Sequence, residues 1–273
     1  MNSVQQQIIS LREVLNRYNY EYYVLDNATI SDYEFDVKLK ELEALEAAYP
    51  EYYNANSPSQ RVGGAVTKNF KTLQHKNRMY SLDNSYSKED LLDWEKRLQK
   101  NLGTEAIEFT CELKYDGASI NLTYENGEFV KAVTRGDGFQ GDEVTSNIRT
   151  IKSIPLVLNA NFLSNFEIRG EIILPLEGFQ KMNQERIENG EDTYRNPRNT
   201  ASGSLKLQDS GEVAKRPLDC LLYQVVTNER TYSTHFESLE ASRAAGFKVP
   251  DTIILAKSID EVFHFVNEWD QKR

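Results

Sequence analysis

The chain has 273 residues, of which 39% are hydrophobic and 27% charged, and its formal net charge is −10. This composition is typical of a globular protein of about one or two domains, and no apolar run approaches the roughly 20 residues of a membrane span. The N-terminus lacks a signal peptide pattern, and the two cysteines and three histidines show no metal-ligand spacing. We therefore expect a cytoplasmic protein that binds no membrane and, in this chain, no zinc. The acidic balance argues against binding nucleic acid by bulk charge.

Two helices are predicted near the N-terminus. Apolar residues recur at helical spacing over residues 4–22, and the sequence Ser-Asp-Tyr-Glu at 31–34 has the form of a capping box. The second helix should end near Tyr49-Pro50. Residues 50–64 are rich in Pro, Gly, Asn and Ser and show no periodicity. The expected organisation is a helical domain over 1–55, a linker over 56–70 and a larger domain over 71–273.

The larger domain alternates short strands with helices. The first half is predicted to contain a helix capped by Ser87, a strand over 109–114, a hairpin of strands from Ala118 and from Phe129 to Thr134, and a short helix over 143–152. A strand over 166–175 follows, and then a helix that ends at Gly190 and has Phe179, Met182 and Ile187 inward. The last predicted elements are a basic loop from Arg195 to Lys206, a strand over 218–226 that contains Tyr223, and a helix that follows a capping box at Ser258.

The most informative stretch surrounds Lys114. Apolar and polar residues alternate over 109–114, so Glu112 and Lys114 share one face of the predicted strand, and Asp116-Gly117 is turn chemistry. A lysine amine is nucleophilic only when neutral, which requires a lowered pKa. The alternative is an ordinary solvated lysine paired with Glu112. Because Lys-x-Asp-Gly occurs by chance in roughly one chain in twenty of this length, the motif alone favours the ordinary lysine.

The N-terminal helices carry a second candidate site. Asp32 and Asp36 project from one helical face, and several tyrosines, including Tyr22, crowd the end of the first helix. Acidic residues suit a helix N-terminus and tyrosines suit a helix interface, so a purely structural role explains both. The functional alternative is a platform that stacks a cationic aromatic ring such as nicotinamide.

In combination and order, further motifs resemble the N-terminal part of bacterial NAD+-dependent DNA ligases, over essentially the whole chain. The matching stretches are Ser57–Gly63, Ser81–Asn84, Cys111–Gly117, Thr134–Gly138, Ile168–Glu171 and Asn196–Asn199, together with Tyr22 and residues 32–36 of the helical hairpin.

The resemblance implies an α+β fold: a helical domain that binds nicotinamide mononucleotide (NMN), then an ATP-grasp-like nucleotidyltransferase domain of antiparallel sheets with peripheral helices. It implies that Lys114 attacks the adenylyl phosphorus of NAD+, forms a lysine–AMP intermediate and releases NMN. It implies that Asp116 is a second catalytic residue. In the whole enzyme AMP then passes to the 5′-phosphate of a nick in double-stranded DNA. Implied to bind the nicotinamide nucleotide are Tyr22, Asp32, Tyr33, Glu34, Phe35 and Asp36. Implied to bind the AMP part are Ser81, Leu82, Glu112, Arg135, Glu171, Arg198 and Tyr223, with Mg²⁺ on the side of Glu171.

The chain departs from the family pattern at three positions. Tyr23 stands where the family often has His, Phe35 where it often has Tyr, and Lys206 where it usually has Arg. The family's later lysine motifs, zinc finger and DNA-binding domains are expected beyond Arg273. We therefore expect this chain, as a monomer, to adenylate slowly or not at all and not to seal nicks. A noncatalytic NAD+- or AMP-binding module and an ATP- or GTP-using RNA-modifying transferase are the alternative interpretations.

Overall fold

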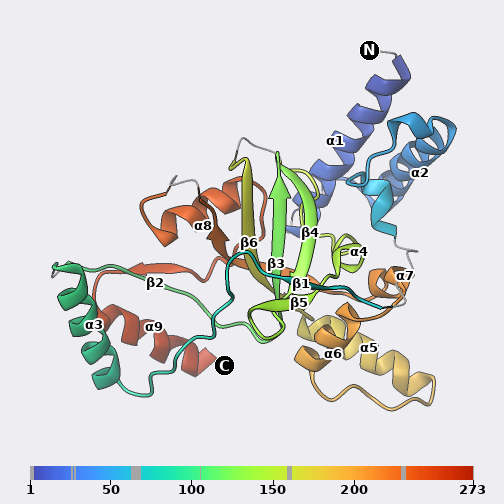
Figure 1. The fold of residues 1–273 in the computed structure, drawn as a ribbon. Helices are drawn as coiled ribbons and strands as arrows, with labels where there is room; N and C mark the ends of the chain where they lie inside the picture. The colour runs from blue at the N-terminus through green and yellow to red at the C-terminus, as the bar shows by residue number, and fades with distance from the viewer. Residues whose placement is uncertain are drawn as a thin grey trace.

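The computed structural model describes residues 3–25, 27, 29–62, 69–104, 106–158, 162–228 and 232–272, with the side chains of Asp32 and Val62 left out. The described residues form a helical hairpin, a central antiparallel sheet with helices around it, and a small strand pair with two helices (Figure 1). None of the helices in these ranges is both long enough and apolar enough to cross a membrane.

The N-terminal hairpin consists of α1 (Ser3–Tyr23) and α2 (Asp32–Ala48), followed by the 3₁₀ helices η1 (Pro50–Tyr52) and η2 (Pro58–Val62). Both predicted helices are confirmed, and so is the capping box. The Ser31 hydroxyl accepts from the Glu34 amide, and the Glu34 carboxylate accepts from the Ser31 amide at 3.0 Å. Buried apolar side chains hold the hairpin together: Ile8, Leu11, Leu15 and Leu42.

The central sheet is fully antiparallel, in the order β4-β3-β6-β7 (Figure 1). Its strands are β3 (Ala118–Glu125), β4 (Glu128–Thr134), β6 (Asn165–Ile173) and β7 (Asp219–Val226). The predicted strands and hairpin are confirmed. Apolar residues of one face, such as Ile120, Leu122 and Ile168, form the main core, whereas Ser119 and Glu171 lie on the opposite face. This alternation gives the sheet one polar face on which a site can form.

A second, smaller core lies beside this sheet. Strand β2 (Phe109–Cys111) pairs antiparallel with β8 (Ile254–Ala256), and α3 (Lys88–Leu102) and α9 (Ile259–Lys272) pack against the pair. The predicted helices are confirmed here, but the predicted strand over 109–114 is too long. Because β8 pairs only with residues 109–111, Lys114 lies in the connection between β2 and β3.

The remaining elements surround the central sheet. They are β1 (Thr72–Gln74), β5 (Gln140–Asp142), α4 (Thr145–Ile148), α5 (Leu176–Glu188), α6 (Pro197–Leu205), α7 (Ser210–Ala214) and α8 (His235–Ala244).

Three sequence predictions about these elements are wrong. Helix α4 is much shorter than predicted, and Ile187 of α5 is 59% exposed rather than inward. The predicted basic loop contains α6, because the Asn196 side chain caps it by accepting from the Asn199 amide and Pro197 takes the first helical position. Helices α7 and α8 were not predicted.

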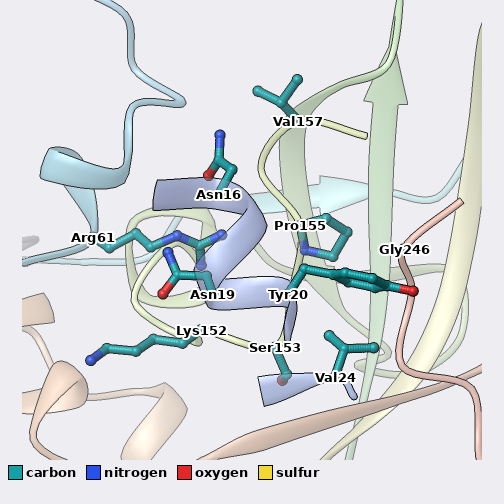
Figure 2. A pocket seen from close by; sticks show the side chains of 10 residues that line it. All are labelled: Asn16, Asn19, Tyr20, Val24, Arg61, Lys152, Ser153, Pro155, Val157 and Gly246. Carbon is teal, nitrogen blue, oxygen red and sulfur yellow. The ribbon is translucent and has the colours of Figure 1, made fainter. Parts of the chain in front are cut away.

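Arg61 of η2 joins the N-terminal region to the segment that follows α4. Its buried guanidinium donates to the carbonyl oxygens of Ile151 and Ile154, at 3.0 and 2.8 Å. Burial lowers the pKa of Arg61 to about 10. Beside it lies a cavity of about 20 Å³, toward which Tyr20 reaches from α1 near Pro155 (Figure 2). The predicted linker therefore contains packed, buried groups in its described part; residues 63–68 lie outside the described residues.

Candidate functional site

A cavity of about 350 Å³ lies against the polar face of the central sheet. It brings together four of the sequence-predicted residues, Lys114, Arg135, Glu171 and Arg198, from four separate segments of the chain. The remaining lining residues are Gly117, Ala118, Ser119, Thr134, Gly136, Asn199, Ser202, Leu205 and Lys206. Three cationic side chains thus surround a lysine and one carboxylate, a charge balance that suits a phosphate-bearing ligand.

The segment that carries Lys114 is fixed by a close backbone contact. A Cβ atom on Gly117 would lie 2.1 Å from the carbonyl oxygen of Ile172 on β6, so only glycine fits there. Gly136 is constrained similarly: its φ is +55°, and a Cβ would lie 1.9 Å from the Gln140 carbonyl oxygen. These two glycines let the backbone approach the neighbouring strands and shape opposite sides of the cavity.

Glu171 is held by the sheet register. Ser119 pairs with it across β3 and β6, and the Ser119 hydroxyl donates to Glu171 Oε2 at 2.7 Å. The hydroxyl of Tyr223 on β7 lies 3.2 Å from Ser119 Oγ. Burial raises the pKa of Glu171, although the Ser119 hydrogen bond and the charge of Lys114 oppose the rise. The buried Glu171 carboxyl is therefore less strongly ionised than an exposed glutamate, although it lies beside a lysine.

The Glu112 carboxylate does not pair with Lys114. Its Oε1 lies 2.7 Å from Nε2 of His235, the first residue of α8. Within the described ranges, no ion pair of 4.0 Å or less involves Lys114. The structure therefore does not match the ordinary reading of a lysine paired with Glu112. Sequence reasoning missed His235, although Thr234 followed by Glu237 is a helix-start signal that could have placed it.

Asp116 does not line the cavity but pairs with Arg198, which does. Arg198 Nη1 lies 2.8 Å from Asp116 Oδ1, and the two side chains are 51% and 66% exposed. A pair this exposed contributes little to stability, so its position at the cavity is the more informative property. Lys206, one of the departures from the family pattern, pairs with Asp142 at 2.8 Å.

A second cavity, of about 370 Å³, lies on the hairpin. Tyr22, Phe35 and Asp36 line it together with Tyr23, and Lys152 reaches it from the larger domain. Tyr33 is not among its lining residues and is 78% exposed. Two further predicted residues are not placed in the cavity by the structure: the Glu34 carboxylate serves the helix cap, which lowers its pKa, and the Asp32 side chain lies outside the described residues.

Several predicted residues do not line the first cavity. Ser81 and Leu82 are exposed in the segment before α3, Glu112 contacts His235, and the Tyr223 hydroxyl contacts the lining residue Ser119. The hairpin cavity and the Lys114 cavity share none of the lining residues described for them.

The donor set fits Mg²⁺ only with help from a ligand. Among the described residues, no group of three or more His, Cys, Asp or Glu side chains could hold a metal ion. Of the described residues that line the cavity, Glu171 alone has a carboxylate, and Mg²⁺ commonly binds one or two carboxylates plus phosphate oxygens and water.

Comparison with known proteins shows two family models that match this chain. Residues 67–273 match the family model described as the NAD-dependent DNA ligase adenylation domain, and residues 1–63 match that of the DNA ligase-like N-terminal NAD+-binding domain. The chain belongs to the NAD-dependent DNA ligase family.

The curated relatives of this family member are full-length proteins named DNA ligase. The chain is 66% identical over 271 residues to the one from Flavobacterium psychrophilum and 65% identical over 271 residues to the one from Flavobacterium johnsoniae, covering 99% of this chain in each case. It is 48% identical over 276 residues to that of Cytophaga hutchinsonii, covering 100% of this chain. The matched region spans 41% of each of these relatives.

Proposed function

We propose that this chain is the adenylation portion of an NAD+-dependent DNA ligase, in which Lys114 accepts AMP from NAD+. The observation that carries the proposal is the position of Lys114: it lines a cationic cavity and has no carboxylate partner within ion-pair distance in the described ranges. A lysine without a carboxylate partner is available to react with an electrophilic phosphorus once its amine is neutral.

In the proposed reaction, the neutral Lys114 amine attacks the adenylyl phosphorus of NAD+. An N–P bond forms, the P–O bond to NMN breaks, NMN leaves with the bonding electrons, and the amine proton passes to solvent. Arg198 and Arg135 would hold phosphate and ribose oxygens, and Arg198 would keep Asp116 at the rim. Tyr223 would stack on adenine and Glu112 would contact the base. Ser81 and Leu82 would complete this site only after the segment before α3 moves.

Glu171 would hold Mg²⁺, and the ion would supply positive charge that neutralises the transferred group. The raised pKa of Glu171 supports a role at such a cation, because a nearby cation would restore its ionisation.

The hairpin would bind the nicotinamide end of NAD+. Asp36, Asp32 and the aromatic residues Tyr22 and Phe35 supply negative charge and stacking surface for a cationic ring. Tyr33 and Glu34 are proposed at its edge. Because the two cavities share no lining residue, we infer that the hairpin moves toward Lys114 when NAD+ bridges them.

The proposal also covers the type of fold, the domain boundaries, the location, the oligomeric state and the DNA substrate. These are the ATP-grasp-like ligase fold, domains at 1–55 and 71–273 joined by 56–70, a cytoplasmic monomer, and nicked double-stranded DNA as the substrate of the whole enzyme. The family match and the relatives' name support the DNA substrate.

The test is the intact mass of the chain before and after incubation with NAD+ and Mg²⁺, with ATP and Lys114→Ala as controls. Because this chain is expected to adenylate slowly at best, we expect a slow gain of one adenylyl group from NAD+ alone, absent in the variant. If NAD+ binds but no mass is gained, the chain is a noncatalytic NAD+-binding module. If ATP transfers AMP better than NAD+, the proposed donor is wrong.

A further inference from the structure

The contact between His235 and Glu112 joins two packing units. His235 begins α8, which packs against β7 of the central sheet, while Glu112 follows β2 of the smaller core. The start of α8 is fixed, because the Thr234 hydroxyl accepts from the Glu237 amide at 3.1 Å and the His235 carbonyl accepts from Ser238 Oγ at 2.7 Å. The imidazole is therefore held from the central sheet and reaches across to the carboxylate at 2.7 Å.

Glu112 would otherwise be a natural partner for Lys114. Two residues span at most about 7 Å of chain, and both side chains are long enough to meet. An ion pair would favour the protonated ammonium, which cannot attack phosphorus. The other charged side chains that line the cavity are the Glu171 carboxylate, which accepts a hydrogen bond from Ser119, and the cations Arg135, Arg198 and Lys206. Asp116, which does not line the cavity, pairs with Arg198. Glu112 is thus the carboxylate whose position decides whether Lys114 stays unpaired.

We propose that His235 is a positioning residue that holds the Glu112 carboxylate away from Lys114 and so keeps the amine free to react. Nε2 donates its hydrogen to the carboxylate, because an ionised carboxylate can only accept. The catalytic consequence rests on the proposed function, but the positioning itself does not.

The first test measures the amine directly, in the full chain and without NAD+. Each protein is acetylated briefly with an N-hydroxysuccinimide ester, and labelling of Lys114 is compared by mass spectrometry with labelling of Lys181, an exposed lysine of α5. The proteins are the wild type, His235→Ala, His235→Gln, Glu112→Gln and the double variant His235→Ala/Glu112→Gln. Melting temperatures show whether each variant is folded.

We expect His235→Ala to slow the relative labelling of Lys114 roughly tenfold, because the released Glu112 captures the ammonium. His235→Gln, which retains an N–H donor, should label nearly as fast as the wild type. In the double variant, the labelling of Lys114 should return to nearly the wild-type rate. Glu112→Gln alone should change the labelling of Lys114 little, because His235 already holds the Glu112 carboxylate away from the amine. Faster labelling in Glu112→Gln than in the wild type would overturn the proposal, and it does not depend on any substitution at His235.

The second test measures AMP transfer from NAD+ in the same proteins. We expect His235→Ala to lower the rate in the wild-type background but to have little further effect in the Glu112→Gln background, since His235 acts through Glu112. If the two substitutions lower the rate of AMP transfer additively, the role of His235 is merely structural. The same conclusion follows if Lys114 of the double variant is labelled as slowly as that of His235→Ala. If the wild type accepts no AMP while labelling changes as expected, the proposed function fails and the positioning role stands.

Discussion

Ser119 Oγ on β3 lies 2.7 Å from Glu171 Oε2 on β6, directly across the register of the two strands. This hydrogen bond holds a partly buried carboxyl on the polar face of the sheet beside Lys114. Burial nevertheless raises the pKa of Glu171 above its ordinary value of 4.5, so the bond and the lysine charge do not fully offset the loss of hydration.

Replacement of Glu171 by Gln should reveal this cost. Because the folded state holds the proton more tightly than the unfolded state, the associated stability is present below pH 4.5 and is lost as pH rises through the raised pKa. Glu171→Gln should therefore melt higher than the wild type at neutral pH, and the difference should vanish in acid. Calorimetric melting curves at several pH values, with the exposed Glu185→Gln as control, test this. A variant that melts lower at neutral pH would contradict it.

Arg198 should matter to phosphate binding far more than to stability. Both side chains of its pair with Asp116 are at least half exposed, so Arg198→Ala should change the free energy of unfolding by less than about 1 kcal/mol. AMP transfer should fall by roughly tenfold or more, because a cation at the cavity is lost. Lys215→Ala, which removes an exposed pair with Glu212, is the matched control and should alter neither property. Equal transfer rates for Arg198→Ala and the wild type would remove Arg198 from the proposed site.

The hairpin cavity should distinguish NMN from AMP. Asp36→Asn removes a negative charge facing the proposed nicotinamide position, and Tyr22→Ala removes a stacking surface. Both variants should bind NMN and NAD+ more weakly, by roughly tenfold, while AMP binding at the Lys114 cavity is unchanged. Isothermal titration with the three ligands measures this, with the exposed Tyr53→Ala as control. Weaker AMP binding in Asp36→Asn would show that the two cavities do not act separately.

Arg61 should be hard to replace, even by lysine. Its two hydrogen bonds to the carbonyl oxygens of Ile151 and Ile154 need a forked donor, which lysine lacks. Arg61→Lys should lower the free energy of unfolding by about 2–4 kcal/mol, because a buried charge and a buried carbonyl lose partners. Urea unfolding measures the change, and Arg97→Lys on the exposed side of α3 is the control. Similar losses in both variants would mean that the buried contacts contribute little.

Local sequence patterns predicted most elements of the fold. The capping box at Ser31, the helix capped by Ser87 and the hairpin of β3 and β4 are confirmed, since each depends on residues a few positions apart. The predicted length of the strand over 109–114 was wrong because a distant partner decides it, whereas the missed helices α6 and α8 have local start signals at Asn196 and Thr234. Strand β2 ends at Cys111 because β8, more than 140 residues later, pairs only that far, and no local pattern carries this information.

The sequence by itself determined the chemistry available: a lysine in a nucleotidyl-acceptor motif, later motifs in family order, and acidic and aromatic residues on a helical hairpin. Only the tertiary structure decided which of these groups meet. Strand register placed Glu171 against Ser119, and the packing of α8 on β7 gave Glu112 a histidine partner instead of Lys114. The physical reason is that periodicity reports which face a residue occupies, whereas contacts between faces depend on long-range packing.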